Sequence, residues 1–403
     1  MVAIALLAAL VGAGIIARDR IAPLRDLLAA EGLSGVYYRF KDRLPGAPAN
    51  VRWETAAPEQ QGFSAPALEA LWRRIDTGGA GAFLVARAGK LIFERYGEEA
   101  GPNQRRDIAA LGKATTAAPV LMLALGDGRL SLDDPASRYV EQWRDDPVKR
   151  SITIRQLAAH SSGLDDVNFL REQSAWKRAY LEQPDQRFRL AVTTAPLLFE
   201  PGTRYSYSGV GYYVLAYAAA VALSREGDRV DLKSLLAERI MEPLGIPQHD
   251  WAIGYGHACE WDGYRLYALG SGGSYTPRAL ARIGQLLLNR GEWQSRRLLD
   301  AAGVDAMLSG LGSPPAREAA ATDPPTGIGV WLNSDGFWPS LPRDAALGAG
   351  GGHQLLLLVP SLDLVVVRLG RALGKDDWEG DFWRALEPAL FQPLMAARSP
   401  QPG

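Results

Sequence analysis

The sequence has a single cysteine, no excess of basic charge and few histidines, and each of these shortages excludes a class of protein. Cys259 alone can form neither an internal disulfide nor a thiolate metal cage, so a disulfide-rich scaffold and a zinc finger are excluded. The 44 basic residues are balanced by 45 acidic ones, for a net charge of -1. A binder of the nucleic-acid backbone needs a basic surface, so we expect no nucleic-acid partner.

The four histidines also show no pattern of metal ligands. His160, His249 and His257 lie far apart, and none belongs to a His-Glu-x-x-His motif. We therefore expect no metal site and no cofactor. His160, within Ala159-His160-Ser161-Ser162-Gly163, is interpreted as a structural turn residue.

The composition is that of a globular protein long enough for one large domain or two interleaved ones. Of its 403 residues, 47% are hydrophobic and 22% are charged. We expect an N-terminal segment at 1–20, a linker at 21–61, a main domain at 62–395 and a tail at 396–403. Within the main domain we expect a sheet lobe at about 62–130 and 325–395, with a helical lobe at about 131–324 between them. The sequence specifies no oligomeric state.

The N-terminal segment has the pattern of a membrane anchor or a signal peptide. Every residue from Val2 to Ala17 is apolar or glycine, which with Met1 reaches the ~17 residues needed to span a bilayer. A buried helix of the fold is the alternative. Arg18, Arg20 and Arg25 follow the run, which favours a cytoplasmic body, and a misassigned start codon would remove that conflict. We expect membrane association and a location in the bacterial cell envelope, facing the periplasm.

Two predicted β-hairpins stand at opposite ends of the main domain. The first joins Phe83–Ala86 to Leu91–Tyr96, and the second joins Gln354–Val359 to Leu364–Leu369 across Pro360-Ser361-Leu362-Asp363. The signals between them are helical. Helices are expected at Ile152–His160, Val210–Leu223, Leu232–Met241 and, after the Thr276-Pro277 cap, up to Gly291. The pattern predicts a sheet made from both ends of the domain with a large helical insertion.

Three segments carry residue types suited to acyl transfer. They are Asp107–Ala114 before an apolar helix, Phe199–Gly209, and Gly348–Gln354 before a strand. Together with Leu157–Leu164 and Val359–Val367, in this order and spacing, they resemble the serine beta-lactamase-related family over roughly Gly62 to Met395. That family includes class C beta-lactamases, D-alanyl-D-alanine carboxypeptidases and esterases. The resemblance implies an α/β, beta-lactamase/transpeptidase-like fold with an antiparallel central sheet.

The first segment departs from the family at the nucleophile. The family pattern Ser-x-x-Lys places a hydroxyl three residues before a lysine, on one face of a helix. Here Lys113 is present, but Ala110 occupies the serine position, and its methyl group cannot attack a carbonyl. We expect the helix N-terminus to favour the neutral form of Lys113. An engineered Ser→Ala change or a natural pseudoenzyme would each explain the alanine.

Other hydroxyl groups are poor substitutes for the missing serine. Thr115 and Thr116 follow Lys113 and point around the helix away from Ala110. Ser174-Ala175-Trp176-Lys177 matches Ser-x-x-Lys literally, but it lies in the expected loop-rich insertion and lacks a following apolar helix. We interpret it as a chance match.

In the second segment the family's Tyr-x-Asn corresponds to Tyr207-Ser208-Gly209, with Tyr205 as a competing assignment. The resemblance implies that Tyr207 acts as general base or acid. A phenol with an ordinary pKa of ~10 can serve as a base only if a cation such as Lys113 stabilises the phenolate. Gly209 replaces an amide that would orient substrate and lysine.

The third segment stands where family members carry Lys-Thr-Gly or His-x-Gly. Successive glycines permit close approach of a ligand to the backbone, and we expect an oxyanion donor near Gly351, Gly352, His353 and Gln354. His353 is expected close to the pocket, as its wall or as a catalytic helper. Trp331 and Trp338 are candidates for its lining.

The sequence therefore predicts a membrane-associated serine hydrolase of the beta-lactamase-related superfamily that is inactive as written. Its substrate would be a small molecule or peptide with an ester or amide bond. The alternative is a non-catalytic module that binds or senses a ligand at the membrane.

Overall fold

The structure is a computed structural model of the 403-residue chain, and it describes residues 53–76, 81–98, 100–167, 174–225, 228–311, 323–373 and 381–398. The apolar N-terminal segment and most of the expected linker lie outside the described residues. The last residues of that linker do not stand apart from the domain. Leu91 donates a backbone hydrogen bond to Glu54 and accepts one from Ala56, so this segment packs along the edge of the sheet.

A six-stranded antiparallel sheet forms the centre of one lobe, with the strand order β10-β11-β12-β13-β1-β2. The strands are β1 (Ala82–Arg87), β2 (Lys90–Tyr96), β10 (Trp331–Leu332), β11 (Ala346–Gly350), β12 (Gln354–Val359) and β13 (Leu364–Leu369). Both predicted hairpins form, and β13 pairs with β1, which joins the two ends of the domain. The predicted fold class is therefore confirmed.

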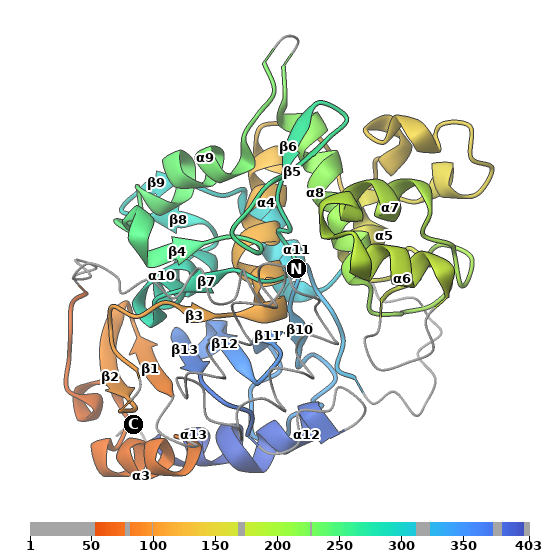
Figure 1. The fold of residues 1–403 in the computed structure, drawn as a ribbon. Coiled ribbons are helices and arrows are strands. Elements are labelled where there is room, and N and C mark those ends of the chain that lie inside the picture. Colours follow the sequence, from red (N-terminus) through yellow and green to blue (C-terminus); the bar gives the residue numbers. More distant parts are fainter. Residues whose placement is uncertain are drawn as a thin grey trace, which may run out of the picture.

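Both faces of this sheet are buried, as the dense Leu and Val content of the second hairpin predicts. Val365 and Val367 of β13 belong to one hydrophobic cluster, while Leu364 and Val366 belong to the other. Alternate side chains of a strand point to opposite faces, so a fully apolar strand needs cover on both sides. One face is covered by α3 (Ala65–Ile75), α12 (Asp381–Leu386), η13 (Glu387–Phe391) and α13 (Gln392–Ala396) (Figure 1).

The other face is covered in part by α10 (Pro277–Leu288), which the sequence had assigned to the helical lobe. Gly284 explains this close packing. A Cβ at position 284 would lie 2.8 Å from side-chain carbons of both Leu356 and Val365, so the helix can approach β12 and β13 only with glycine there. α10 therefore packs with the sheet, although its residues fall within the range expected for the helical lobe.

The helical lobe lies on the far side of α10 and α4 from the sheet (Figure 1). The predicted helices form at α5 (Ile154–Ala158), α8 (Gly209–Leu223) and α9 (Leu232–Leu236), the last continuing into a π-turn, η10 (Ala237–Met241). The remaining elements here are η6 (Ala136–Arg138), η7 (Glu141–Trp143), η8 (Lys149–Ser151), α6 (Ala175–Glu182), η9 (Pro184–Gln186), α7 (Arg187–Thr193) and η11 (Gln248–Asp250).

The remaining strands that the structure describes are short and form three small sheets. They are β3 (Arg106–Asp107), β7 (Ser274–Tyr275) and β4 (Trp251–Ala252) in one three-stranded sheet, β5 (Cys259–Trp261) with β6 (Tyr264–Leu266), and β8 (Glu292–Trp293) with β9 (Arg296–Arg297). β3 directly precedes the segment that carries Ala110, and its partner β7 directly precedes α10.

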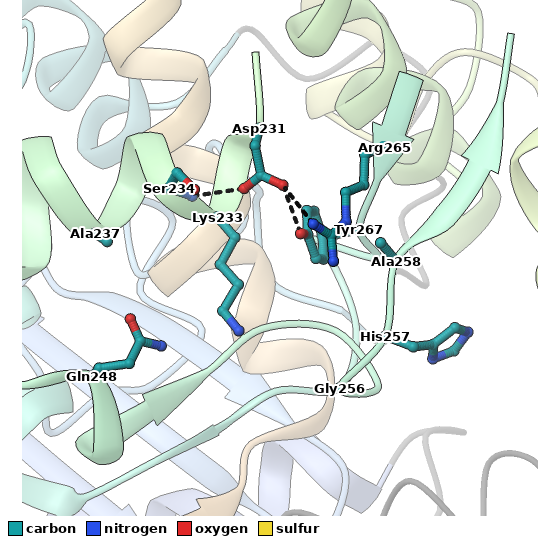
Figure 2. Close-up of a pocket in the computed structure, with 10 residues that line it drawn as sticks. All are labelled: Asp231, Lys233, Ser234, Ala237, Gln248, Gly256, His257, Ala258, Arg265 and Tyr267. Atoms are coloured by element: carbon teal, nitrogen blue, oxygen red, sulfur yellow. Dashed lines mark hydrogen bonds and ion pairs between the residues drawn. The ribbon is translucent and has the colours of Figure 1, made fainter. Parts of the chain in front are cut away.

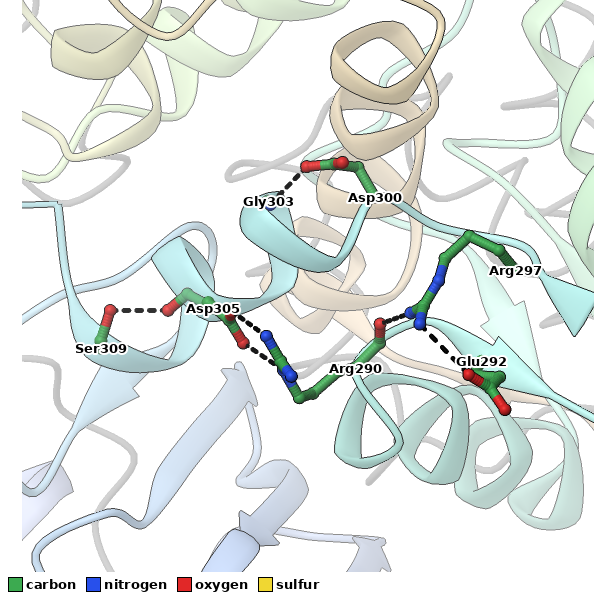
Figure 3. A network of polar contacts seen from close by, with 7 residues as sticks. All are labelled: Arg290, Glu292, Arg297, Asp300, Gly303, Asp305 and Ser309. Carbon is green, nitrogen blue, oxygen red and sulfur yellow. Dashed lines mark hydrogen bonds and ion pairs between the residues drawn. The ribbon is translucent and has the colours of Figure 1, made fainter. Parts of the chain in front are cut away.

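A surface network joins the end of α10 to α11 (Ala301–Ser309) (Figure 3). The Nε of Arg290 lies 2.7 Å from Oδ1 of Asp305, and Asp300 caps α11 by accepting from Gly303 at 2.6 Å. The Arg290 and Asp305 side chains are largely exposed, and exposed ion pairs contribute ~0–1 kcal/mol. This network therefore adds little to stability beyond its N-cap.

One helical stretch within the described ranges, Ala109–Gly126, is long and apolar enough to cross a membrane, and 78% of it is buried inside the protein. Its apolar composition is explained by its position in the core.

Candidate active site

The segment around Ala110 begins the central helix of the protein. It runs through η4 (Ala109–Leu111), a π-turn η5 (Lys113–Ala117) and α4 (Ala118–Gly126). Ala109 has a φ of +47°, a left-handed conformation that few non-glycine residues adopt and that is concentrated at functional sites. Ala110 is partly exposed, whereas Leu111 is fully buried. The backbone therefore presents residue 110 at the start of a buried helix.

Lys113 lies three residues further on and is buried, with 1% of its surface exposed. Its ammonium group donates to the phenol oxygen of Tyr207 at 2.6 Å and to the carbonyl of Gly270 at 2.8 Å. Burial lowers the pKa of Lys113 to about 8, and the carboxylate of Asp166 opposes that shift. The expected cause was the helix N-terminus, but the largest cause is the loss of water around the buried ammonium.

Tyr207 lies just before α8, and its ring stacks on two other rings. Its own ring stacks on the imidazole of His160, with centroids 4.6 Å apart, and on the indole of Trp331 at 6.2 Å. Tyr207, and not Tyr205, is thus the hydrogen-bond partner of Lys113. Burial raises the pKa of Tyr207, and the Asp166 carboxylate raises it further, so the phenol keeps its proton. Of the two roles that the resemblance implies for Tyr207, a protonated phenol suits the acid.

His160 does hold a turn, as expected, and it also supports the site. It has a φ of +57°, and its Nδ1 accepts from the backbone N–H of Ser208 at 3.1 Å. Burial and the Lys113 charge lower the pKa of His160 well below its usual value, so the ring is neutral. A neutral ring can stack on Tyr207 without adding a second cation beside Lys113.

Asp166 is a member of the site that the sequence analysis missed. The backbone N–H of Val210 donates to its Oδ1 at 3.2 Å, at the N-terminus of α8. A Cβ at Gly209 would lie 3.4 Å from the same oxygen, so the Asp166 carboxylate lies next to the position that a side chain at residue 209 would occupy. Burial raises the pKa of Asp166, and its charge acts on Lys113. Asp165-Asp166 follows the Leu157–Leu164 motif directly, but only the fold distinguishes the two carboxylates.

Two glycines inside β11, Gly348 and Gly350, pack against the start of the helix that carries Ala110. A Cβ at Gly350 would lie 3.1 Å from the backbone nitrogen of Ala110 and 2.9 Å from that of Leu111. A Cβ at Gly348 would lie 2.7 Å from a methyl of Leu111. Only glycine lets the strand pack this closely on the start of the helix, so β11 forms a shelf beside residue 110.

The predicted oxyanion residues lie just beyond this shelf. Gly351, Gly352 and His353 form the turn between β11 and β12. The imidazole of His353 is fully buried and stacks on Phe382 at 4.2 Å, in the cluster on the opposite face of the sheet from Leu111. The side-chain amide of Gln354 forms two hydrogen bonds with the backbone of Gly370, the residue after β13. In the contacts described, neither the His353 ring nor the Gln354 amide is bonded to Lys113 or Tyr207.

A buried arginine explains why this turn is structural. Arg368, 1% exposed, donates from Nη1 to the carbonyls of Gly352 and His353 at 3.0 and 2.9 Å. Buried charges are tolerated only when hydrogen-bonded, and here the turn carbonyls supply the acceptors. The glycine run thus serves two purposes, with Gly348 and Gly350 against the helix and Gly351–His353 around Arg368.

Comparison with known proteins agrees with this geometry. A family model described as Beta-lactamase matches residues 68–389. The chain belongs to the beta-lactamase family. Solved structures of the same fold include a penicillin-binding protein homologue from Caulobacter crescentus, with TM-score 0.61, 18% identity and coverage of 85% of this chain and 100% of that one. A family VIII carboxylesterase has TM-score 0.61 and 18% identity, with coverage of 85% and 99%.

Curated relatives match over shorter stretches. The lovastatin esterase of Penicillium rubens is 33% identical over 168 residues, which are 37% of this chain and 40% of the esterase. The D-alanyl-D-alanine-carboxypeptidase/endopeptidase AmpH of Escherichia coli is 31% identical over 178 residues, 41% and 43% of the two chains. A D-aminopeptidase of Brucella canis is 29% identical over 192 residues, 45% and 35%. The chain thus matches less than half of the length of each.

Of the other hydroxyl groups considered for this beta-lactamase-family chain, the two threonines have other hydrogen-bond partners and Ser174 lies on another helix. Thr115 is buried and donates to the Leu111 carbonyl at 3.2 Å, and Thr116 is buried against the Tyr275 hydroxyl at 2.9 Å. Ser174 is the exposed N-cap residue of α6, and Lys177 forms an ion pair with Asp165 at 2.9 Å. None of these four side chains contacts the Lys113–Tyr207 pair in the contacts described.

Both tryptophans considered for the pocket lining belong to the same buried cluster, and of the two, Trp331 is the one whose ring stacks on Tyr207 in the contacts described. The indole N–H of Trp338 donates to the Trp383 carbonyl at 2.9 Å.

Among the described residues, one group of potential metal ligands comes together, away from Lys113. It consists of Asp185, His257 and Cys259. Asp185 is more than 70 residues from His257 and Cys259 in the chain, so the ligand spacing along the sequence does not reveal this group.

Proposed function

We propose that this chain carries the acyl-transfer site of a beta-lactamase-family serine hydrolase with alanine at the nucleophile position. The observation that carries the proposal is the 2.6 Å hydrogen bond between Tyr207 and Lys113. Lys113 stands three residues after Ala110 in the same helix. A methyl group cannot form an acyl intermediate. The chain as written would therefore bind an ester or amide and not turn it over through residue 110.

The relatives support the bond type. They are named as an esterase, a carboxypeptidase/endopeptidase and an aminopeptidase, and all three activities cleave an ester or amide at a carbonyl carbon. A shared requirement of these reactions is a base for the nucleophile, an acid for the leaving group and donors for the oxyanion.

The residues of the site suit these three roles once a hydroxyl stands at position 110. With a pKa of about 8, about a tenth of Lys113 is neutral at pH 7 and able to accept the hydroxyl proton. Tyr207 keeps its proton and can donate it toward the leaving group. We assign the oxyanion donor to the backbone N–H of Ala110, whose nitrogen borders the shelf at Gly350.

The test is to restore the hydroxyl. The parent chain and Ala110→Ser would be assayed with p-nitrophenyl acetate and with a chromogenic cephalosporin. Loss of a serine nucleophile costs on the order of 10⁶ in turnover in a comparable hydrolase, so we expect the variant to be faster by at least about 10³-fold on one substrate. Equal rates from the two folded proteins would overturn the proposal.

The second candidate is a non-catalytic module that binds such a ligand at a membrane in the bacterial envelope. The apolar run Val2–Ala17 favours it. Its test has two parts: saturable binding of a D-alanyl-D-alanine peptide by the parent chain, and recovery of the full chain in the membrane fraction. A chain without residues 1–20 is the control for the second part and should be found in the soluble fraction.

A further inference from the structure

Three side chains with different donor atoms meet where η9 contacts β5. Asp185 lies in η9, His257 in the loop before β5, and Cys259 is the first residue of β5. The Nε2 of His257 is 3.3 Å from Oδ1 of Asp185 and 4.0 Å from Sγ of Cys259, and all three donor atoms lie within 4.8 Å of one another. They come from two segments about 75 residues apart in the chain.

These separations are close to the edges of a metal-centred tetrahedron. Zinc takes nitrogen and oxygen ligands at ~2.0–2.1 Å and sulfur at ~2.3 Å, which places neighbouring ligand atoms about 3.3–3.6 Å apart. The His257–Asp185 distance already has this length. The His257–Cys259 distance needs to shorten by only about half an ångström, within the reach of small side-chain rotations.

The donor set also selects the metal. One thiolate, one imidazole and one carboxylate suit Zn²⁺, whereas Ca²⁺ and Mg²⁺ prefer oxygen ligands alone. A thiolate and a carboxylate together balance the double charge of the ion. Binding would release the thiol proton of Cys259 to solvent.

The surroundings permit an ion to enter. The Asp185 side chain is 75% exposed and that of His257 is 19% exposed, while Cys259 is buried beneath them. The backbone around His257 borders a cavity of about 380 Å³ whose lining includes Asp231, Lys233 and Arg265. Figure 2 shows the imidazole turned away from the Asp231 and Lys233 side chains in that cavity, so it is available on its other side to Asp185.

We propose that Asp185, His257 and Cys259 bind one Zn²⁺ ion, with the fourth position left to solvent. The ion would fasten η9 to the β5–β6 hairpin. Arg187, two residues after Asp185, lies over the ring of Tyr255 at 5.7 Å, so the ion would fix a contact that already joins these two segments. This site is independent of the proposed function.

Cobalt is the probe, because Co²⁺ occupies zinc sites and its absorption spectrum depends on the ligands that bind it. The full chain, stripped with a chelator, would be titrated with CoCl₂ and then with ZnCl₂. We expect one equivalent of Co²⁺ to give a thiolate-to-cobalt charge-transfer band in the near ultraviolet, and Zn²⁺ to abolish it. Zn²⁺ should also raise the melting temperature of the parent chain.

Cys259→Ser should lose the charge-transfer band, and His257→Ala should weaken Zn²⁺ binding at least tenfold by calorimetry. His249→Ala is the matched control, because His249 pairs with Asp250 on η11 and has no sulfur neighbour there. Far-ultraviolet circular dichroism checks that each variant is folded. A parent chain without the charge-transfer band would overturn the proposal, and so would folded Cys259→Ser and His257→Ala variants that bind Zn²⁺ as tightly as the parent.

Discussion

The phenol oxygen of Tyr207 lies 2.6 Å from the ammonium nitrogen of Lys113, and the two groups are removed from water together. Burial moves their pKa values in opposite directions, down to about 8 for Lys113 and upward for Tyr207. Each shift favours the neutral form. A pair that tends toward neutral amine and neutral phenol is suited to pass a proton between a nucleophile and a leaving group.

The shift of Lys113 predicts how stability depends on pH. Its pKa in the folded state, about 8, is below the unfolded value of 10.5, so the unfolded chain binds more protons between these values. The Lys113 contribution to the free energy of unfolding must therefore rise with pH in that window. Relative to Lys113→Met, the parent should gain roughly 2 kcal/mol between pH 7 and pH 9.5.

Urea unfolding of both proteins at the two pH values measures this difference, in which the other titrating groups largely cancel. A constant difference between parent and variant would show that Lys113 titrates normally, and the buried ammonium described here would be incorrect.

Removing the Tyr207 hydroxyl should impair catalysis once the nucleophile is restored. In the Ala110→Ser background, Tyr207→Phe deletes both the Lys113 acceptor and the proposed acid, and we expect kcat to fall by about 10²-fold or more. Tyr205→Phe is the matched control and should retain most activity. Similar losses from the two substitutions would mean that the assignment of Tyr207 is wrong.

Asp166 should set the pH at which Lys113 becomes a base. Its carboxylate raises the pKa of Lys113, so Asp166→Asn should lower that pKa from about 8 to a smaller value. In the Ala110→Ser background, the acidic limb of the profile of kcat/KM against pH should move to lower pH.

Asp165→Asn is the control for this shift, because Asp165 instead pairs with Lys177 at 2.9 Å and accepts from Trp176 at 3.3 Å. An acidic limb that stays in place in Asp166→Asn, or moves equally in Asp165→Asn, would count against the role given to Asp166.

Gly350 should tolerate no side chain. An added Cβ would overlap the carbonyl oxygen of Ile108 and lie 2.9 Å from the Leu111 nitrogen, so Gly350→Ala must push β11 away from the helix. We expect a loss of about 1–3 kcal/mol in the free energy of unfolding. Gly101→Ala, where an added Cβ meets no atom within 4 Å, should be close to neutral. Equal melting temperatures for the two variants would contradict the close packing of β11.

Much of this architecture follows from the sequence. Two hairpins of apolar strands and the Pro277-initiated helix have strong local signals, and the structure has both hairpins and that helix. Lys113 and Tyr207 were identified by resemblance, and their contact confirms that the two segments meet. Local patterns succeed where each segment's own residues determine its conformation.

The remaining features depend on packing between distant segments, which a local pattern does not contain. Asp166 acts at the start of α8, 44 residues later. Gly348 and Gly350 face the helix because they lie two residues apart in β11, whereas the His353 ring follows in the turn and stacks on Phe382. Gly284 is another such case, because it lets α10 pack closely on β12 and β13 of the sheet.

The most direct test of the proposed acyl-transfer site is the mass of the protein after exposure to an acylating ester. We expect Ala110→Ser to gain one acyl group, and we expect no adduct on the parent chain or on Ala110→Ser combined with Lys113→Met. An adduct that forms equally on all three proteins, or on none of them although Ala110→Ser is folded, would contradict the account.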